Sequence, residues 1–330
     1  MKDVKYAVMG CSREITNVGD FVQSIAGKQY LPKVDMYMDR DLDLKKYEGE
    51  KVKMIMNGWY MHQPENWPPS DDIDPLLLSM HINASVYDSM TSSESLAYFK
   101  KHEPIGCRDK GTMKILNKNG VDAYFSGCLT LTLGKSYKRE EKNITDEVLF
   151  VDPLFHYWSL KTMLSDLKKL GARIKKRRFA EFLLKKKVLR ENFTTEVLEK
   201  AQYIDQTIPR TTVEDNFRIA DEYLKRLCNA KLVVTSRIHC ALPCLAMGTP
   251  VVFLNGGFGG NNNRFNSRFE GLIDFFNRID IDDNTNVISR NFDLKGKIGL
   301  DNLPTNKTLH IPYAKDLVEK CEQFVTNFQN

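Results

Sequence analysis

One strand-to-helix junction sets the pattern for the chain: Val233-Val234-Thr235-Ser236-Arg237-Ile238-His239-Cys240-Ala241-Leu242. An apolar strand ends here, and polar residues follow where a helix begins. In open α/β sheets, ligands bind beyond the carboxyl ends of the strands, and a helix N-terminus favours an anion. Arg237 can hold a phosphate or carboxylate with its planar fork, and His239 can give up a proton near neutral pH. The alternative is that Arg237 pairs with a structural carboxylate and that His239 packs in the core.

Short apolar strands and amphipathic helices alternate on both sides of this junction, which predicts parallel sheets flanked by helices. Strands are expected at Tyr6–Met9, Val34–Met38, Val52–Asn57, Leu76–His81, Ile105–Cys107, Ala123–Phe125, Val148–Val151, Leu232–Thr235 and Val251–Leu254. Helices are expected at Asp20–Gln29, Ser93–His102, Lys110–Asn117, Glu214–Cys228, Ile238–Met247 and Ala314–Phe328.

A length of 330 residues suits two domains of about 150 residues each. The polar stretch at 134–146 has no apolar periodicity and is typical of a linker. We expect an N-terminal α/β domain over 1–140 and a C-terminal α/β domain, carrying the Arg237 motif, over 147–312. A last helix over 313–330 is expected to cross back to the N-terminal domain. The predicted fold class is α/β, with two Rossmann-like domains facing a cleft.

The net charge of +5 is too small to indicate a nucleic-acid partner. The seven cysteines have irregular spacing, which favours reduced, buried thiols over disulfides or a metal site. The N-terminal residues lack the layout of a secretory leader, and no apolar run reaches the roughly 18 residues of a membrane span. We therefore expect a cytoplasmic protein.

One segment is strongly basic. Residues 173–190 hold nine Lys or Arg and one Glu, with apolar residues between them. Such a pattern suits peripheral contact with anionic lipid at the inner face of the cytoplasmic membrane. It equally suits a solvated helix face whose apolar residues pack on the domain core.

Three further motifs stand at strand ends: Asn17-Val18-Gly19-Asp20, Gly106-Cys107-Arg108-Asp109 and Phe125-Ser126-Gly127-Cys128. Gly19 permits a tight turn, and Asp20 can cap the helix or act as a base. Arg108 is placed to meet an anion. Taken singly, each motif also suits an ordinary turn, or an ion pair between Arg108 and Asp109.

Aromatic and histidine side chains follow two other predicted strands. Trp59 and His62 come after one of them, and His81 ends the next. Rings with polar tips are common where sugars stack, although a lone histidine beside aromatic residues is more often structural. Asp280 and Asp282 form only a weak metal-binding pattern, and the glycine-rich loop at 256–260 lacks the ending of a phosphate-binding loop. No metal is expected.

Taken in this order, the motifs resemble those of the polysaccharide pyruvyl transferase family. The resemblance covers roughly residues 5–270 and rests on Asn17–Asp20, Gly106–Asp109, Ser126–Cys128, Ser236–His239 and Gly248–Val251. The segments Asn57–His62 and Ser79–His81 look like the branch that decorates bacterial capsular polysaccharides. The resemblance implies a fold similar to B-type glycosyltransferases. It also implies phosphoenolpyruvate as donor co-substrate, without a nucleotide sugar, a cofactor or a metal.

The resemblance also implies that Arg237, His239 and Arg108 bind the donor, and the chemistry of the reaction suggests the full set of roles. Donor binding falls on Arg237 and Arg108, with Ser236, Asn17 and Gly19 beside them. His239, Asp20 and His62 are the catalytic candidates, and His81, Trp59 and Ser126 the acceptor-binding ones. The implied acceptor is a galactose- or mannose-type glycan, lipid-linked, in surface polysaccharide biosynthesis. Two alternatives stay open: a nucleotide-sugar glycosyltransferase of the same fold, and a non-catalytic glycan-binding protein.

Overall fold

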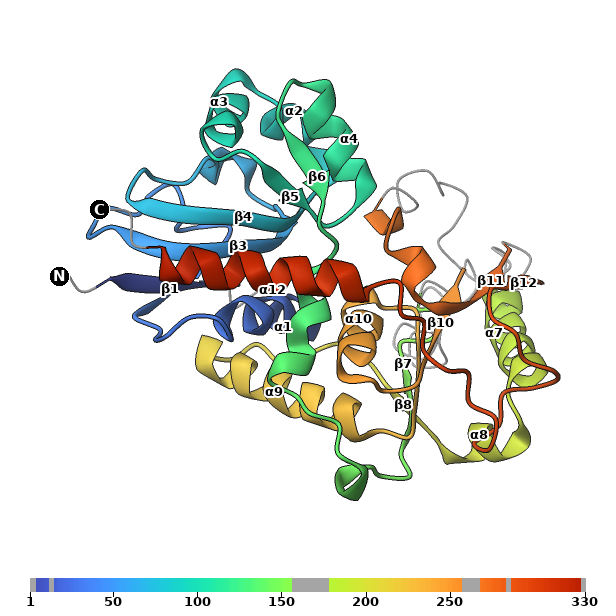
Figure 1. Ribbon diagram of the computed structural model, residues 1–330. Coiled ribbons are helices and arrows are strands. Elements are labelled where there is room, and N and C mark those ends of the chain that lie inside the picture. Colours follow the sequence, from blue (N-terminus) through green and yellow to red (C-terminus); the bar gives the residue numbers. More distant parts are fainter. Residues whose placement is uncertain (1–3, 12–14, 156–177, 257–267, 283–285, 328–330) are drawn as a thin grey trace, which may run out of the picture.

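The computed structural model describes residues 4–11, 15–155, 178–256, 268–282 and 286–327, and residues 178–184 only by their backbone. Two six-stranded sheets, each covered by helices, lie side by side (Figure 1). The predicted fold class is confirmed, because both sheets are mostly parallel.

The N-terminal sheet is parallel throughout, in the order β2-β1-β3-β4-β5-β6. Its strands are β1 (Lys5–Gly10), β2 (Met36–Asp39), β3 (Val52–Tyr60), β4 (Ile73–Ile82), β5 (Ile105–Cys107) and β6 (Ala123–Phe125). Its helices are α1 (Val18–Lys28), α2 (Tyr87–Met90), α3 (Ser93–Lys101) and α4 (Lys110–Lys118). Central strands such as β3 are almost wholly buried, because helices cover both faces of a parallel sheet.

The C-terminal sheet has the order β12-β11-β10-β9-β7-β8, and only the β11–β12 pair is antiparallel. Its strands are β7 (Val148–Val151), β8 (Ala201–Ile204), β9 (Leu232–Thr235), β10 (Val251–Asn255), β11 (Asn277–Ile281) and β12 (Val287–Arg290). The helices of this half are α7 (Arg178–Asn192), α8 (Thr195–Lys200), α9 (Val213–Asn229), α10 (Ile238–Met247) and α12 (Ile311–Thr326). Helix α10 begins directly after β9 and continues through Pro243.

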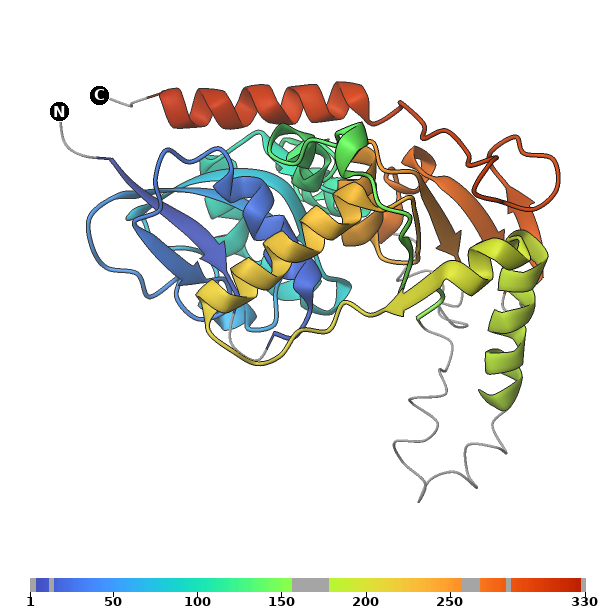
Figure 2. The same ribbon diagram turned by 90° about the horizontal axis from the view of Figure 1, so that it is seen from below.

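Helices from the C-terminal half pack on the N-terminal half. Helix α12 runs along the N-terminal sheet, and α9 lies against α1 (Figures 1 and 2). Leu317 and Cys321 of α12 belong to the same buried cluster as Phe21 of α1. Lys53 Nζ donates to the carbonyl of Phe324 at 2.9 Å, which ties the end of α12 to β3. The last helix thus follows the C-terminal half in the sequence and packs on the N-terminal half.

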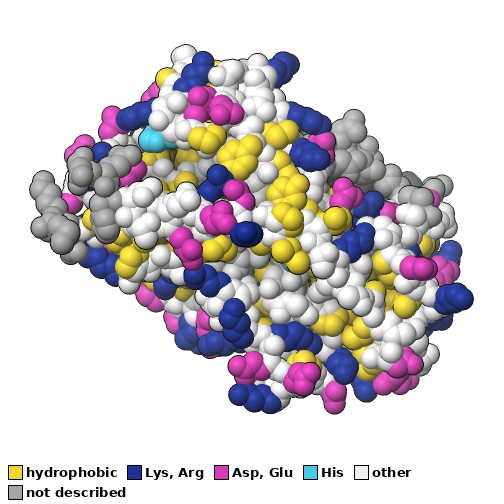
Figure 3. Space-filling model, in the orientation of Figure 1, with side chains coloured by type: hydrophobic (Ala, Val, Ile, Leu, Met, Phe, Trp, Pro, Cys, Tyr) yellow, Lys and Arg dark blue, Asp and Glu magenta, His cyan; other side chains and the backbone are white. Residues whose placement is uncertain are grey.

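Acidic and basic side chains are interspersed on the face shown in Figure 3, in keeping with the net charge of +5. All seven cysteines are buried free thiols. Among the residues that the structure describes, no helix combines the length and the apolar character needed to cross a bilayer.

Candidate functional site

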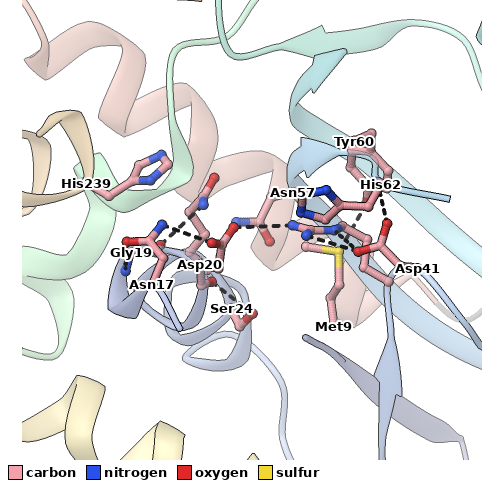
Figure 4. Close-up of polar contacts among 12 residues, drawn as sticks. Met9, Asn17, Gly19, Asp20, Ser24, Asp41, Asn57, Tyr60, His62 and His239 are labelled. Carbon is pink, nitrogen blue, oxygen red and sulfur yellow. Dashed lines mark hydrogen bonds and ion pairs between the residues drawn. The ribbon is translucent and has the colours of Figure 1, made fainter. Parts of the chain in front are cut away.

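The start of α1 lies close to His239 in the C-terminal half of the chain. Asn17 caps the helix: its Oδ1 accepts from the Gly19 backbone N–H at 3.3 Å, and its Nδ2 donates to Asp20 Oδ2 at 2.9 Å. A Cβ atom on Gly19 would lie 3.1 Å from His239 Cβ and 3.3 Å from His239 Nδ1. A side chain larger than glycine would therefore press on the imidazole, which Figure 4 shows facing this turn.

His239 begins α10 and meets Arg108 from the end of β5. Nη1 of Arg108 lies 3.4 Å from His239 Nε2 and donates to Gln23 Oε1 at 3.3 Å. A guanidinium only donates hydrogen bonds, so Nε2 facing it is the acceptor and the ring proton is assigned to Nδ1. Burial, reinforced by the charges of Arg108 and Arg268, holds the pKa of His239 well below its usual range.

Buried guanidinium groups with unused N–H donors gather around His239. Arg108 is fully buried, and its Nε and Nη2 have no hydrogen-bond partner among the described residues. The same is true of Nε of Arg268, whose pKa is lowered to about 10 by burial and by the charge of Arg108. Buried donors are costly unless something accepts from them. An anion held between these groups would satisfy them.

Sequence reasoning missed Arg268. It stands beyond the glycine-rich loop and outside any strand-end motif, so no local pattern marks it. Only the fold brings it near Arg108, Asp109 and Arg237, whose charges all act on it.

Arg237, the cap residue of α10, extends from the C-terminal half of the chain. Its Nε donates to Asp152 Oδ2 at 2.9 Å, and its guanidinium carbon lies 3.6 Å from the centre of the Phe155 ring. The side chain is about one-third exposed. The pairing with a carboxylate that the sequence left open is therefore present, and it engages only one nitrogen of the fork.

His81, near the end of β4, also lies close enough to Arg108 to feel its charge. Its Nδ1 lies 2.6 Å from Asp109 Oδ2, and Asp109 Oδ1 accepts from the Thr112 backbone N–H at 2.9 Å. Burial and the charge of Arg108 lower the pKa of His81 to about 4, so the ring is neutral and donates to Asp109. The strand is irregular just before this point, with Ser79 at a φ of 59°.

A polar network leads away from His239 along the end of the N-terminal sheet (Figure 4). Asp20 Oδ1 accepts from buried Arg40 at 3.3 Å, and Arg40 Nη2 lies 3.1 Å from Asp41 Oδ2. Asp41 Oδ1 in turn accepts from the backbone N–H of His62 at 2.6 Å. The Trp59 ring lies 5.2 Å from the Arg40 guanidinium and 4.3 Å from the His62 ring. Arg40 and Asp41, which the sequence did not single out, thus connect Asp20 to the exposed His62.

The two predicted serines have backbone partners. Ser236 Oγ donates to the Leu254 carbonyl at 2.7 Å and accepts from the Leu154 N–H at 2.8 Å. Ser126 Oγ donates to the Cys107 carbonyl at 3.0 Å. These bonds join neighbouring strand ends, and the ligand contacts of both serines stay predictions.

The weaker motifs lie apart from this network. Asp280 accepts from Arg278 Nε at 3.0 Å, Asn255 Nδ2 at 2.6 Å and Ser289 Oγ at 3.0 Å. In the described part of the chain, no group of three or more His, Cys, Asp or Glu could hold a metal. The glycine-rich loop lies outside the described residues from 257 onward.

The comparisons with known proteins agree with this picture at the level of family. A family model described as "Polysaccharide pyruvyl transferase" matches residues 17–257, which include Asn17, Arg108 and His239. No curated protein matches the chain.

Two solved structures have low similarity to the chain. A functionally uncharacterised Klebsiella pneumoniae protein is 13% identical, with a TM-score of 0.42, over 86% of this chain and 93% of its own. A Methanocaldococcus jannaschii UDP-GlcNAc 2-epimerase in complex with UDP-GlcNAc and UDP is 10% identical, with a TM-score of 0.35, over 99% of this chain and 94% of its own.

Proposed function

The chain belongs to the polysaccharide pyruvyl transferase family, and from this premise we propose that it moves pyruvate from phosphoenolpyruvate onto two hydroxyls of one sugar, forming a ketal during capsule or other surface polysaccharide biosynthesis. The observation that carries the proposal is the fully buried Arg108, whose Nε and Nη2 have no hydrogen-bond partner among the described residues. The ion pair with Asp109 that the sequence left open is present, but at 3.9 Å from Nε it is too long for a hydrogen bond. A guanidinium in that state is complementary to an anion.

Phosphoenolpyruvate suits such a place because its phosphate and carboxylate lie close together. Arginine binds both groups through paired N–H donors, and such charge-assisted bonds are about twice as strong as neutral ones. Arg108 and Arg268 would meet the donor from inside the protein, and Arg237 from the more exposed side. Asn17 and Gly19 would line the same position, since Gly19 lies against His239.

In the proposed reaction a proton adds to C3 of phosphoenolpyruvate, and the double-bond electrons form the new C–H bond. The cation left at C2 is attacked by one sugar hydroxyl, which loses its proton. The C2–O bond to phosphate then breaks with its electrons, and a second hydroxyl attacks C2 to close the ketal. Of the two hydroxyl protons, one replaces the proton delivered to C3 and the other leaves with phosphate.

His239 is the proposed proton donor to C3. It is neutral in the empty site, because burial and the arginines hold its pKa well below the usual range. Bound phosphate and carboxylate would neutralise those arginines and favour the charged imidazole. His239 would then become protonated, and able to act as a general acid, only when the donor is bound.

Asp20 is the proposed acceptor of a hydroxyl proton, since Asn17 and Arg40 fix its carboxylate one residue from the Gly19 turn. Trp59 and His62 would receive the sugar ring at the outer end of the same network. The proposed acceptor is a galactose- or mannose-type residue of a lipid-linked repeat unit, with His81 and Ser126 as further candidate contacts.

The choice of donor tests the proposal against the two alternatives. We expect phosphoenolpyruvate to raise the melting temperature of the protein, and UDP, GDP and their sugars to leave it unchanged. We expect turnover to persist in excess chelator. Protection by a nucleotide together with a strict need for magnesium or manganese would favour a glycosyltransferase. Sugar binding without turnover of any donor would favour a glycan-binding protein.

A further inference from the structure

We propose that Asp152 is a positioning residue that presents Arg237 to the donor, an inference that rests on the proposed function. Asp152 Oδ2 accepts from Arg237 Nε at 2.9 Å. This bond uses the inner nitrogen of the guanidinium and leaves the two terminal nitrogens for end-on contact with an anion. The carboxylate can therefore orient Arg237 without competing for the donor.

The backbone after β7 is shaped for this contact. Asp152 has a φ of 44° and Leu154 a φ of 51°, in the left-handed region that costs a non-glycine residue about 1 kcal/mol or more. The Ser236 hydroxyl holds this turn by accepting from the Leu154 N–H at 2.8 Å. Two strained residues within three positions place a carboxylate and an aromatic ring, Phe155, on Arg237.

The contacts with Phe155 and Asp152 restrict different movements of the Arg237 guanidinium. The Phe155 ring lies against the group, with its centre 3.6 Å from the guanidinium carbon, and limits movement toward that side. The bond to Asp152 fixes the direction of Nε. Without these contacts, the one-third exposed side chain of Arg237 would be ordered only when the donor binds, and the lost conformational entropy would weaken binding.

Asp152 also reaches the other half of the chain. Its Oδ2 accepts from the Gln206 backbone N–H at 3.1 Å, and the Gln206 carbonyl accepts from the Val18 N–H at 2.8 Å. The segment that carries Asn17 and Gly19 is thereby joined, through one carboxylate, to Arg237. This chain of hydrogen bonds fixes the position of Arg237 relative to the start of α1.

The test is calorimetric titration of phosphoenolpyruvate into the wild type, Asp152→Asn, Arg237→Lys and the double variant. Asparagine tolerates the left-handed backbone and keeps an acceptor oxygen, so Asp152→Asn removes chiefly the charge. We expect it to weaken donor binding about tenfold or more, as for a lost charged hydrogen bond, and to leave the acceptor KM unchanged. In the Arg237→Lys background, which lacks Nε–H, the second substitution should add little.

Glu147→Gln is the matched control, because Glu147 pairs with Arg226 at 2.8 Å just before the opposite end of the same strand. It should leave donor binding intact. Equal donor binding by wild type and Asp152→Asn, or fully additive effects with Arg237→Lys, would overturn the inference about Asp152. Failure of the wild type itself to bind phosphoenolpyruvate would instead refute the proposed function.

Discussion

Nη1 of Arg108 lies 3.4 Å from Nε2 of His239, inside a site where both side chains are buried. The proposed catalytic acid therefore faces a permanent cation when no donor is present. Donor binding and protonation of His239 should be coupled, because the charges of the donor remove the penalty that the arginine imposes.

The first prediction is that phosphoenolpyruvate binds with uptake of protons. The pKa of His239 is depressed in the empty protein, so the ring is neutral at pH 7, and it should rise when the donor binds. Affinity should accordingly fall as pH rises. Calorimetric titrations in buffers of different ionisation enthalpy measure the uptake, with His239→Gln separating the contribution of the donor's own phosphate. Equal uptake by wild type and variant would contradict the coupling.

His239→Gln should separate binding from proton transfer. We expect the maximal rate to fall roughly 100-fold or more, as for loss of a general acid, while donor affinity stays within about tenfold. Steady-state kinetics and donor titration give the two quantities. If donor binding disappears instead, His239 serves mainly as a donor ligand.

Arg268→Met should weaken donor binding without lowering the stability of the empty protein. The buried Nε of Arg268 has no hydrogen-bond partner in the part of the chain that the structure describes, which is unfavourable in the empty protein. The free energy of unfolding without donor should therefore stay equal or increase in the variant. Donor affinity should fall by about tenfold or more, because a charged contact is lost. Denaturant unfolding and calorimetry provide the measurements. Unchanged affinity would place Arg268 outside the donor site.

Gly19→Ala should lower activity without weakening the fold. Alanine favours a helix over glycine by about 1 kcal/mol, but its Cβ would stand 3.1 Å from His239 Cβ and displace the ring. Gly27→Ala, later in α1 and tight only against Asn57 and Ile55, is the control for a mere crowding effect. Equal activities of the two variants would show that the Gly19–His239 approach is unimportant.

Contact with anionic lipid stays a prediction. In the described part of the basic segment, Val188 and Leu189 are buried, while Lys186, Lys187 and Arg190 are exposed. These two apolar residues pack on the core, and the exposed basic residues would meet lipid through their charges. We expect sedimentation with anionic vesicles at low salt and release at high salt. Replacing the three exposed basic residues with Gln should weaken it. Lys185 is kept, since it lies near Asp152. A wild type that ignores such vesicles at low salt would refute the idea.

The strand-to-helix order of the chain was predictable because buried parallel strands leave continuous apolar runs. β5, β6, β7 and β9 have the predicted bounds. β8 was missed because it is a half-exposed edge strand, as were β11, which alternates buried and half-buried residues, and β12.

Some residues of the candidate site were likewise predictable from the sequence, and others were not. Arg108, Arg237 and His239 were found because they stand at strand ends. Asp152 and Arg40 also directly follow strands, β7 and β2, but no motif marks them, and Arg268 lies outside any strand-end motif. Their contacts with the site depend on tertiary packing. The sequence also gave no sign that Arg108 would face His239 directly, since the two are 131 positions apart.

The most direct test of the central claim is a single reaction containing the protein, phosphoenolpyruvate and a galactose- or mannose-terminated acceptor. Inorganic phosphate and the sugar product are measured together, the product by mass spectrometry and by its methyl signal in nuclear magnetic resonance. We predict one phosphate released for each pyruvate ketal formed, no ketal without acceptor, and loss of both products in Arg237→Lys. Transfer from a nucleotide sugar under the same conditions, with phosphoenolpyruvate left intact, would contradict the account.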